Sequence, residues 1–284
     1  MRYTCLLSGL SSMLSLFSKV RKPNDPNEAA EMSFLDHFDA LRKHLFRIAL
    51  YITIGTVIVF LQKKFVFDSI ILAPLNKEFI TYRFFCGLSE FTCFDPGNIK
   101  IITRELSDQL TVHLKVSFFI GIIITFPFCL YELWKFIKPG LYQKEIDATT
   151  GIIAACTLLF ISGILFGFYV IAPFSVSFLA SYDVSSRVEN TATLTSIVDN
   201  MTMFTLSTGA VFELPVLVYF LARLGIMSDQ FMRTYRRHAI VVITIVAAII
   251  TPPDVSSMII VTIPLLFLYE MSIFIAKKYY PKAD

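Results

Sequence analysis

The chain has 284 residues, of which 55% are hydrophobic and 17% are charged, and its formal net charge is +3. A soluble protein of this length needs far more polar surface, so the composition excludes an ordinary soluble domain and indicates a protein that crosses the membrane several times. The small net charge by itself indicates little about function, because in a membrane protein the positions of Lys and Arg along the chain matter more than their total number.

The first 31 residues differ from the rest of the chain. Arg2 precedes the stretch CLLSGLSSMLSLF, as in a signal peptide, but Ser and Gly interrupt the apolar run and no A-x-A cleavage site follows closely. We therefore interpret residues 1–31 as a poorly ordered N-terminal extension, or as translation from a start codon upstream of Met32. Residues 32–284 then form the membrane domain.

Six apolar segments follow Met32, and each is a candidate membrane span. A spanning helix needs about 20 apolar residues, so the fifth segment is short for a hydrocarbon core of about 30 Å. The six segments lie at about 45–61, 114–136, 151–172, 201–222, 238–251 and 258–275.

Prolines lie inside these spans or at their ends. Each proline removes a backbone donor and tends to kink its helix, and kinked helices can pack into a curved wall with a concave face. The four prolines are Pro127, Pro173, Pro215 and Pro264. The sequence therefore predicts an all-α membrane protein built from kinked helices.

Basic residues predict how the chain is oriented in the membrane. Lys and Arg gather in the N-terminal segment, in the 136–148 and 223–237 loops and at the C-terminus, and they are scarce in 173–200 and 252–257. By the positive-inside rule both termini are cytoplasmic. The 62–110 loop also carries basic residues, but it is long enough for the rule to weaken, so we expect it outside.

The cysteines and histidines form no metal-binding or redox pattern. No C-x-x-C occurs among the five cysteines, and for Cys86 and Cys93 in the outer loop a disulfide and two free thiols are both open. Nucleotide-binding, serine hydrolase and zinc protease motifs are absent as well. The four histidines read as ordinary interfacial polar residues: His37, His44, His113 and His238. We expect no metal, no cofactor and no enzymatic activity.

Glu213 lies in the middle of the fourth span, within FTLSTGAVFELPVLVYFLA. A charged residue near the bilayer centre costs at least about 2.5–3.5 kcal/mol, so a carboxylate there is a functional candidate by default. It is either a protonated Glu that holds the bundle together through a hydrogen bond, or a polar site for an ion or for a partner helix. We favour the second interpretation, with Lys115 as a candidate partner.

Acidic residues also lie on the side that we predict to be cytoplasmic. Carboxylates there could bind a guanidinium in bidentate fashion, or they could be solvated charges that pair with nearby Lys and Arg. Composition alone favours solvated charges. The residues concerned are Asp36, Asp39, Glu132, Glu145 and Asp147.

Five segments together resemble the TatC family, the polytopic core subunit of the twin-arginine protein translocase. The resemblance covers about Ser33 to Tyr279, with the segments in the order of the family. They are FLDHFDALRKHLFR, LAPL, FPFCLYELWKFIKPGLYQKE, FELPV and ITPPDVSS. The resemblance implies six spans in a concave, glove-like arrangement, with both termini cytoplasmic, in the bacterial plasma (inner) membrane.

The resemblance also implies a receptor and not an enzyme. Such a protein binds signal peptides with two consecutive arginines and recruits TatA- and TatB-type single-span proteins. Folded proteins are then exported by the proton-motive force, and several copies of the subunit assemble in a larger complex. The resemblance assigns Glu145 to the bound arginines and Glu213 to a partner helix or the signal peptide.

The first helix departs from the family pattern H-L-x-E-L-R, whose Glu is a second arginine-binding carboxylate. This chain has Ala40 at that position. Asp36 lies one helical turn before Ala40 on the same face, whereas Asp39 points about 100° away. Our hypothesis is that Asp36 or Asp39 substitutes for the missing Glu.

Two other classes of function stay open on the residues alone. A proton- or ion-coupled secondary transporter could use Glu213, although the chain shows no internal repeat and no matching pair of broken helices. An intramembrane hydrolase would need a Ser/His, paired-Asp or metal-binding set within the spans, and none is evident.

Overall fold

A computed structural model describes residues 34–88, 100–138, 151–182, 191–252 and 255–280. The side chains of residues 34–37 lie outside this description. The chain divides into two compact units, Met1–Lys43 and His44–Asp284. Residues 34–43 of the first unit form the start of helix α2, and the contacts given below all belong to the second unit.

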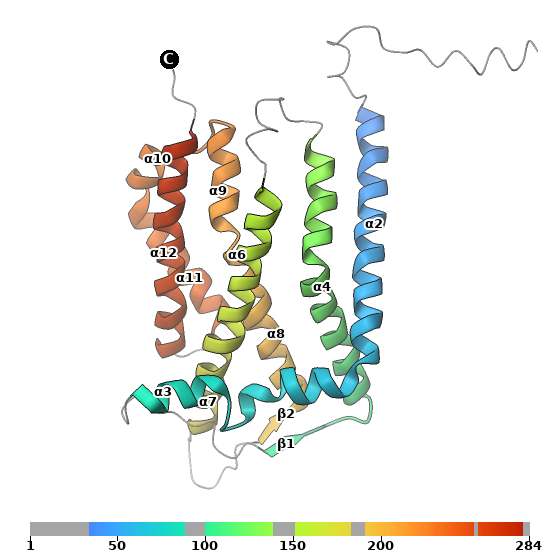
Figure 1. The fold of residues 1–284 in the computed structure, drawn as a ribbon. Helices are drawn as coiled ribbons and strands as arrows, with labels where there is room; N and C mark the ends of the chain where they lie inside the picture. The colour runs from blue at the N-terminus through green and yellow to red at the C-terminus, as the bar shows by residue number, and fades with distance from the viewer. Residues whose placement is uncertain (1–33, 89–99, 139–150, 183–190, 253–254, 281–284) are drawn as a thin grey trace, which may run out of the picture. The chain divides into compact units, whose positions relative to one another are not determined.

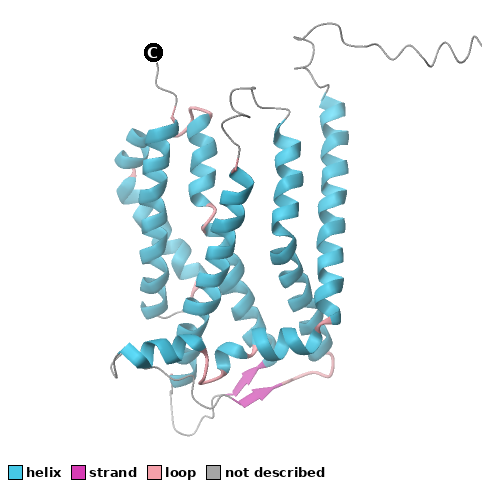
Figure 2. Ribbon diagram, viewed as in Figure 1, coloured by secondary structure: helices cyan, strands magenta, loops and turns pink. Residues whose placement is uncertain are grey.

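Helices account for most of the described residues (Figures 1 and 2). The α-helices are α2 (Phe34–Leu61), α3 (Ile80–Leu88), α4 (Asp108–Ile137), α6 (Ile152–Phe166), α7 (Ala172–Ser181), α8 (Leu194–Val211), α9 (Leu214–Arg223), α10 (Asp229–Thr234), α11 (Arg236–Ile250) and α12 (Val255–Tyr279). Two three-residue strands, β1 (Lys100–Ile102) and β2 (Thr191–Thr193), pair in parallel. The predicted all-α fold is confirmed in part: the described residues are mostly helical, but they also include this pair of short strands.

Five helical segments in the described part of the chain are long and apolar enough to cross a membrane. They are Phe38–Leu61, Asp108–Ile137, Ile152–Ser181, Leu194–Arg223 and Val255–Tyr279. The predicted span at 238–251 corresponds to α11, which has only 15 residues. At 1.5 Å per residue α11 is about 22 Å long, shorter than a hydrocarbon core of about 30 Å. The count of six spans therefore stays a prediction.

Prolines interrupt two of the spanning segments and leave two intact. The third segment passes from α6 through the π-helical turn Gly167–Ile171 into α7, with Pro173 in the first turn of α7. The fourth breaks between α8 and α9, with Pro215 in the first turn of α9. In contrast, α4 and α12 run as single helices through Pro127 and Pro264.

Residues 62–88 and 100–107 lie at the end of the bundle where the strands are (Figure 1). They contain a π-helical turn (Phe65–Ile71), a short 3-10 helix (Ala73–Leu75) and α3. The Tyr82 hydroxyl donates to the Pro74 carbonyl at 2.8 Å, and the Thr81 hydroxyl donates to the Tyr169 carbonyl at 2.6 Å. These bonds hold α3 against the rest of the segment and against the turn that follows α6.

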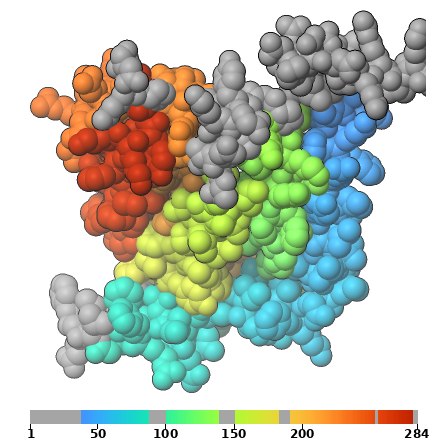
Figure 3. All heavy atoms as spheres, turned by 45° about the horizontal axis from the view of Figure 1, so that its top comes forward, coloured from blue at the N-terminus to red at the C-terminus, as the bar shows by residue number. Residues whose placement is uncertain are grey.

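Many large apolar side chains point outward, as expected where lipid replaces water. Leu61 is 74% exposed, Phe267 is 65% exposed and Phe274 is 75% exposed. The largest buried cluster joins the third, fourth and last spanning segments, and it contains Ile171, Phe204 and Leu265. In the space-filling view the surface of α6 lies between those of α12 and α4 (Figure 3).

Helices α6 and α8 pack closely because small residues face each other. The Thr208 hydroxyl donates to the Gly163 carbonyl at 2.9 Å. A Cβ atom at Gly163 would lie 2.7 Å from the Thr208 carbonyl oxygen and 2.8 Å from the Gly209 Cα atom. Both of these are backbone atoms, so the helices themselves would have to move apart. Small residues commonly allow such close packing between membrane helices.

Replacing Gly163 with alanine is expected to lower the free energy of unfolding by about 1–3 kcal/mol, the usual cost of overpacking. The midpoint of thermal unfolding in detergent measures this. Gly87→Ala in α3 is the matched control, because a Cβ there meets nothing within 4 Å. Alanine also favours a helix over glycine by about 1 kcal/mol, so the control should keep or raise the midpoint. If Gly163→Ala and Gly87→Ala lowered the unfolding midpoint equally, close packing at Gly163 would not be the cause.

Candidate functional site

Glu132 on α4 is a buried carboxylate, and its side chain is only 5% exposed. The Nδ1 atom of His44 lies 2.6 Å from its Oε2 atom. Arg47 Nη1 donates to the same oxygen at 3.5 Å, and the Tyr51 hydroxyl donates to Oε1 at 3.5 Å. These three residues are spaced by three and four positions on α2, so they share one helical face. We call this set the Glu132 cluster.

The Glu132 cluster joins α4 to the part of α2 that begins at His44. A buried carboxylate is stable only when it is paired and hydrogen-bonded, and His44 and Arg47 supply that pairing. The ring of Phe136 lies 6.1 Å from that of His44, and the ring of Phe128 lies 6.0 Å from that of Tyr51. The last turns of α4 are therefore fixed where the chain leaves for residues 139–150, the segment that contains Glu145.

This geometry corrects two sequence interpretations. Glu132 is not a solvated surface charge, because it is buried and is already paired with a guanidinium of its own chain. His44 is not an ordinary interfacial residue, since it is the closest partner of that carboxylate. His113 on α4 is likewise buried. It is 6% exposed, and its ring stacks on Phe60 with the centroids 4.1 Å apart.

Glu213 lies at the break between α8 and α9, directly before the first residue of α9. Its Oε1 atom is buried and has no hydrogen-bond partner among the described residues. The thiol of Cys156 on α6 interacts with the carboxyl group. Lys115 is not its partner, because Lys115 Nζ lies 2.5 Å from Asp199 Oδ1. The structure thus leaves one oxygen of Glu213 available for a further polar group.

The other predicted site residues fall partly outside the described residues. Glu145 and Cys93 lie outside them, and so does the side chain of Asp36, whose backbone belongs to α2. Asp39 is exposed on α2. Cys86 takes part in a disulfide bond, and its pairing with Cys93 stays a prediction.

Within the described ranges, no group of three or more His, Cys, Asp or Glu side chains could hold a metal ion. Two carboxylates are therefore the groups of chemical interest. Glu132 is neutralised by side chains of its own chain. Glu213 keeps one oxygen without a hydrogen-bond partner among the described residues. Such groups suit binding and helix association within a membrane. They define a multi-pass membrane protein whose polar sites lie on its spanning helices.

Comparison with known proteins supplies the family. Residues 36–264 match the model of the TatC family, Sec-independent protein translocase protein, and the chain belongs to this family. It is 37% identical over 256 residues to the Sec-independent protein translocase protein TatC of Blattabacterium sp. subsp. Periplaneta americana (strain BPLAN), covering 88% of this chain and 96% of that protein. It is 35% identical over 254 residues to TatCy of Bacillus subtilis (strain 168), covering 89% and 92%.

Two solved structures have the same fold. Both are crystal structures of the twin arginine translocase receptor TatC, the second in DDM, and both are 29% identical to this chain. Their TM-scores are 0.67 and 0.68, with 86% and 85% of this chain and 99% of each solved chain covered. The protein is therefore a membrane component of a bacterial protein translocase, which works in a complex with other Tat subunits.

Proposed function

We propose that the protein is the receptor subunit of a twin-arginine translocase and binds signal peptides with two consecutive arginines. With TatA- and TatB-type single-span partners it exports folded proteins across the inner membrane, driven by the proton-motive force. The observation that carries the proposal is the carboxyl group of Glu213, half-buried at a helix break with one oxygen unpaired among the described residues. Such a group is expensive in a membrane unless a partner meets it, and a partner helix or a bound signal peptide supplies that partner.

The arginine-binding part of the proposal rests on Glu145 together with Asp36 or Asp39. Guanidinium groups bind carboxylates in bidentate geometry, so two arginines call for two acidic positions. Asp39 is exposed on α2, where its carboxylate is accessible to one of them. The Glu132 cluster supports the arrangement indirectly, because it fixes the end of α4 from which the Glu145 segment leaves.

The proposed topology has six spans with both termini in the cytoplasm, in a glove-like arrangement. The five long apolar helices support five of these spans. For α11 to be the remaining span, the bilayer must thin locally around its 15 residues.

Photocrosslinking tests the proposal. Probes at positions 36, 39 and 145 in the assembled translocase are expected to capture an RR signal peptide roughly tenfold more efficiently than a KK peptide. Lysine cannot reproduce the bidentate contact, and a difference of about 1.4 kcal/mol corresponds to tenfold. A probe at Glu105, exposed near the strands, is the control and should capture neither peptide.

Two results would count against parts of the proposal. Equal capture of RR and KK peptides, or no capture from any of the three positions in a folded complex, rejects the receptor function and favours an ion-coupled transporter. Unchanged binding by the double variant Asp36→Asn with Asp39→Asn rejects the idea that either residue replaces the missing Glu.

A further inference from the structure

Helices α9 and α12 end beside each other, at the end of the bundle opposite the strands (Figure 1). The guanidinium carbon of Arg223, the last residue of α9, lies 5.0 Å from the centroid of the Tyr279 ring. Lys278 Nζ lies 5.3 Å from the same centroid. Arg223 also lies over the ring of Tyr219, one turn earlier on α9, at 5.7 Å. Two positive charges therefore lie close to one tyrosine ring.

No carboxylate of the described residues neutralises these two charges. Within that part of the chain, neither Arg223 nor Lys278 forms an ion pair, and the Arg223 Nε atom is buried without a hydrogen-bond partner. Arg236 of α11 differs, because it pairs with Glu270 of α12 at 2.5 Å. Like charges repel, and a buried donor without an acceptor costs free energy. The pair of Arg223 and Lys278 thus indicates a site for an anion from outside the chain.

The depth of this pair in the membrane indicates what carries the anion. Two candidate spans end at these residues, since they cover Leu194–Arg223 and Val255–Tyr279. Tyrosine rings gather where the hydrocarbon core meets the lipid headgroups, and Tyr219 and Tyr279 flank the Arg223 guanidinium. The two cations therefore lie at the level of the headgroup phosphates, and basic sites between helices at this level bind anionic headgroups.

The surface of α12 next to Lys278 is apolar and exposed. Phe267, Met271, Phe274 and Lys278 follow one another at steps of four, three and four residues, so they share one helical face. The three apolar side chains are 65%, 47% and 75% exposed. We call them the α12 apolar face. An apolar face that ends in a cation matches a ligand whose anionic group is joined to acyl chains, which neither free phosphate nor an acidic protein segment offers.

We propose that the ends of α9 and α12 form a binding site for an anionic phospholipid. Its phosphate oxygens accept hydrogen bonds from Arg223 and Lys278 beside Tyr279, and its acyl chains lie along the α12 apolar face. The inference rests on α9 and α12 lying in spanning segments and not on twin-arginine binding, so it can fail separately from the proposed function.

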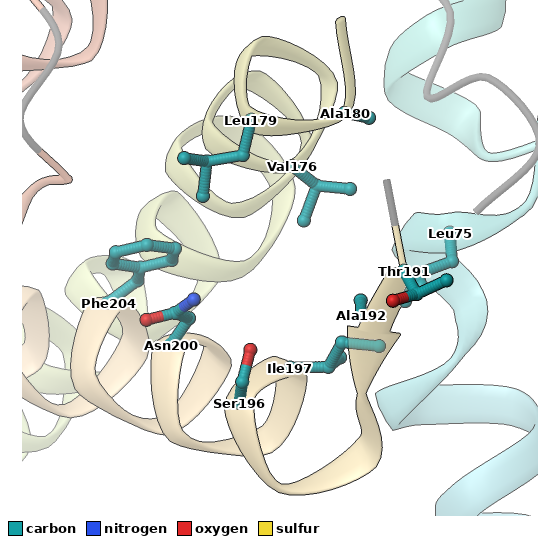
Figure 4. Close-up of a pocket in the computed structure, with 10 residues that line it drawn as sticks. All are labelled: Leu75, Val176, Leu179, Ala180, Thr191, Ala192, Ser196, Ile197, Asn200 and Phe204. Atoms are coloured by element: carbon teal, nitrogen blue, oxygen red, sulfur yellow. The ribbon is translucent and has the colours of Figure 1, made fainter. Parts of the chain in front are cut away.

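A pocket of about 190 Å³ at the strand end of the bundle offers no comparable site. It lies between α7, α8 and β2, and its lining among the described residues contains no Lys or Arg (Figure 4). Those walls give no preference for an anionic headgroup over a zwitterionic one. That preference is the property that distinguishes the site at Arg223 and Lys278, and it can be measured.

Native mass spectrometry of the purified protein with added phosphatidylglycerol or phosphatidylcholine, matched in their acyl chains, tests the proposal. Phosphatidylglycerol should bind more tightly. Arg223→Gln and Lys278→Gln should each weaken its binding at least tenfold, since a hydrogen bond to a charged group contributes more than the roughly 1.4 kcal/mol that a tenfold change represents. Lys278 is exposed, so its variant keeps the test valid if Arg223→Gln fails to fold.

Lys277→Gln is the matched control. It removes an exposed lysine of the same helical turn that does not lie over the Tyr279 ring, and it should change the binding of phosphatidylglycerol less than twofold. Inorganic phosphate in tenfold excess over the lipid should displace none of it, because phosphate has no acyl chain to lie on the α12 apolar face.

Three outcomes would overturn the inference. Equal weakening by Lys277→Gln and Lys278→Gln would mean that the lipid is attracted by the whole basic end of the bundle and not by a site. Equal binding of the two lipids to the unchanged protein would leave an acidic segment of a partner subunit as the anion. Displacement by inorganic phosphate would make this a phosphate site in which the α12 apolar face takes no part.

Discussion

Replacing Glu132 with leucine is expected to lower the free energy of unfolding by about 3 kcal/mol. Breaking a buried ion pair by removing one partner typically costs about 3–5 kcal/mol, because the remaining charge is left uncompensated. His44 is the residue that loses its closest polar partner, since its side chain is 16% exposed and its Nδ1 atom lies 2.6 Å from Glu132 Oε2. Arg47 is 49% exposed and can turn toward water, which places the expected loss at the lower end of that range.

The measurement is thermal unfolding of the purified protein in detergent. Glu270→Leu is the matched control: it breaks the pair with Arg236 at 2.5 Å, but both side chains are about half exposed, at 46% and 57%. Exposed pairs contribute about 0–1 kcal/mol, so this variant should unfold close to the unchanged protein. Equal decreases in the unfolding temperature of the two variants would mean that the burial of Glu132 does not determine how much it contributes to stability.

The Glu132 cluster marks a limit of sequence reasoning in this chain. His44 and Glu132 are 88 residues apart, and no local pattern connects them. Taken one at a time, they read as an interfacial histidine and a solvated carboxylate. The sequence nevertheless carries a signal, because His44, Arg47 and Tyr51 place polar groups on one face of the mostly apolar stretch 44–61 of α2. A polar face on a spanning helix requires a polar partner on a neighbour.

The helices themselves could be predicted far better than their contacts. Long apolar runs predict membrane-spanning helices through composition alone, and Pro215 by itself indicates the interruption of the fourth span. The Lys115–Asp199 pair and the short helices within residues 62–88 could not be predicted in the same way. They depend on which residues packing brings together, and tertiary contacts such as that of Tyr82 with Pro173 determine this.

Replacing Glu213 with leucine is expected to have the opposite effect on stability from the change at Glu132. Glu213 Oε1 is buried without a hydrogen-bond partner among the described residues, and an unsatisfied buried polar group costs about 1–3 kcal/mol. The variant should therefore unfold at the same temperature as the unchanged protein or at a higher one. Export of a folded RR-signal protein into membrane vesicles should nevertheless fall roughly tenfold or more, since a contact worth about 1.4 kcal/mol with the partner is lost.

Measuring both quantities on the same preparation separates the two interpretations of this carboxyl group. If Glu213 is kept for function at a cost in stability, its replacement should raise the unfolding temperature and lower export. Cys156→Ala is the matched control, because it removes the thiol that interacts with Glu213 and leaves the carboxyl group in place, so export should persist. If Glu213→Leu instead lowers the unfolding temperature as Glu132→Leu does, the carboxyl group holds the bundle together, and the polar site for a partner must be sought elsewhere on the spanning helices.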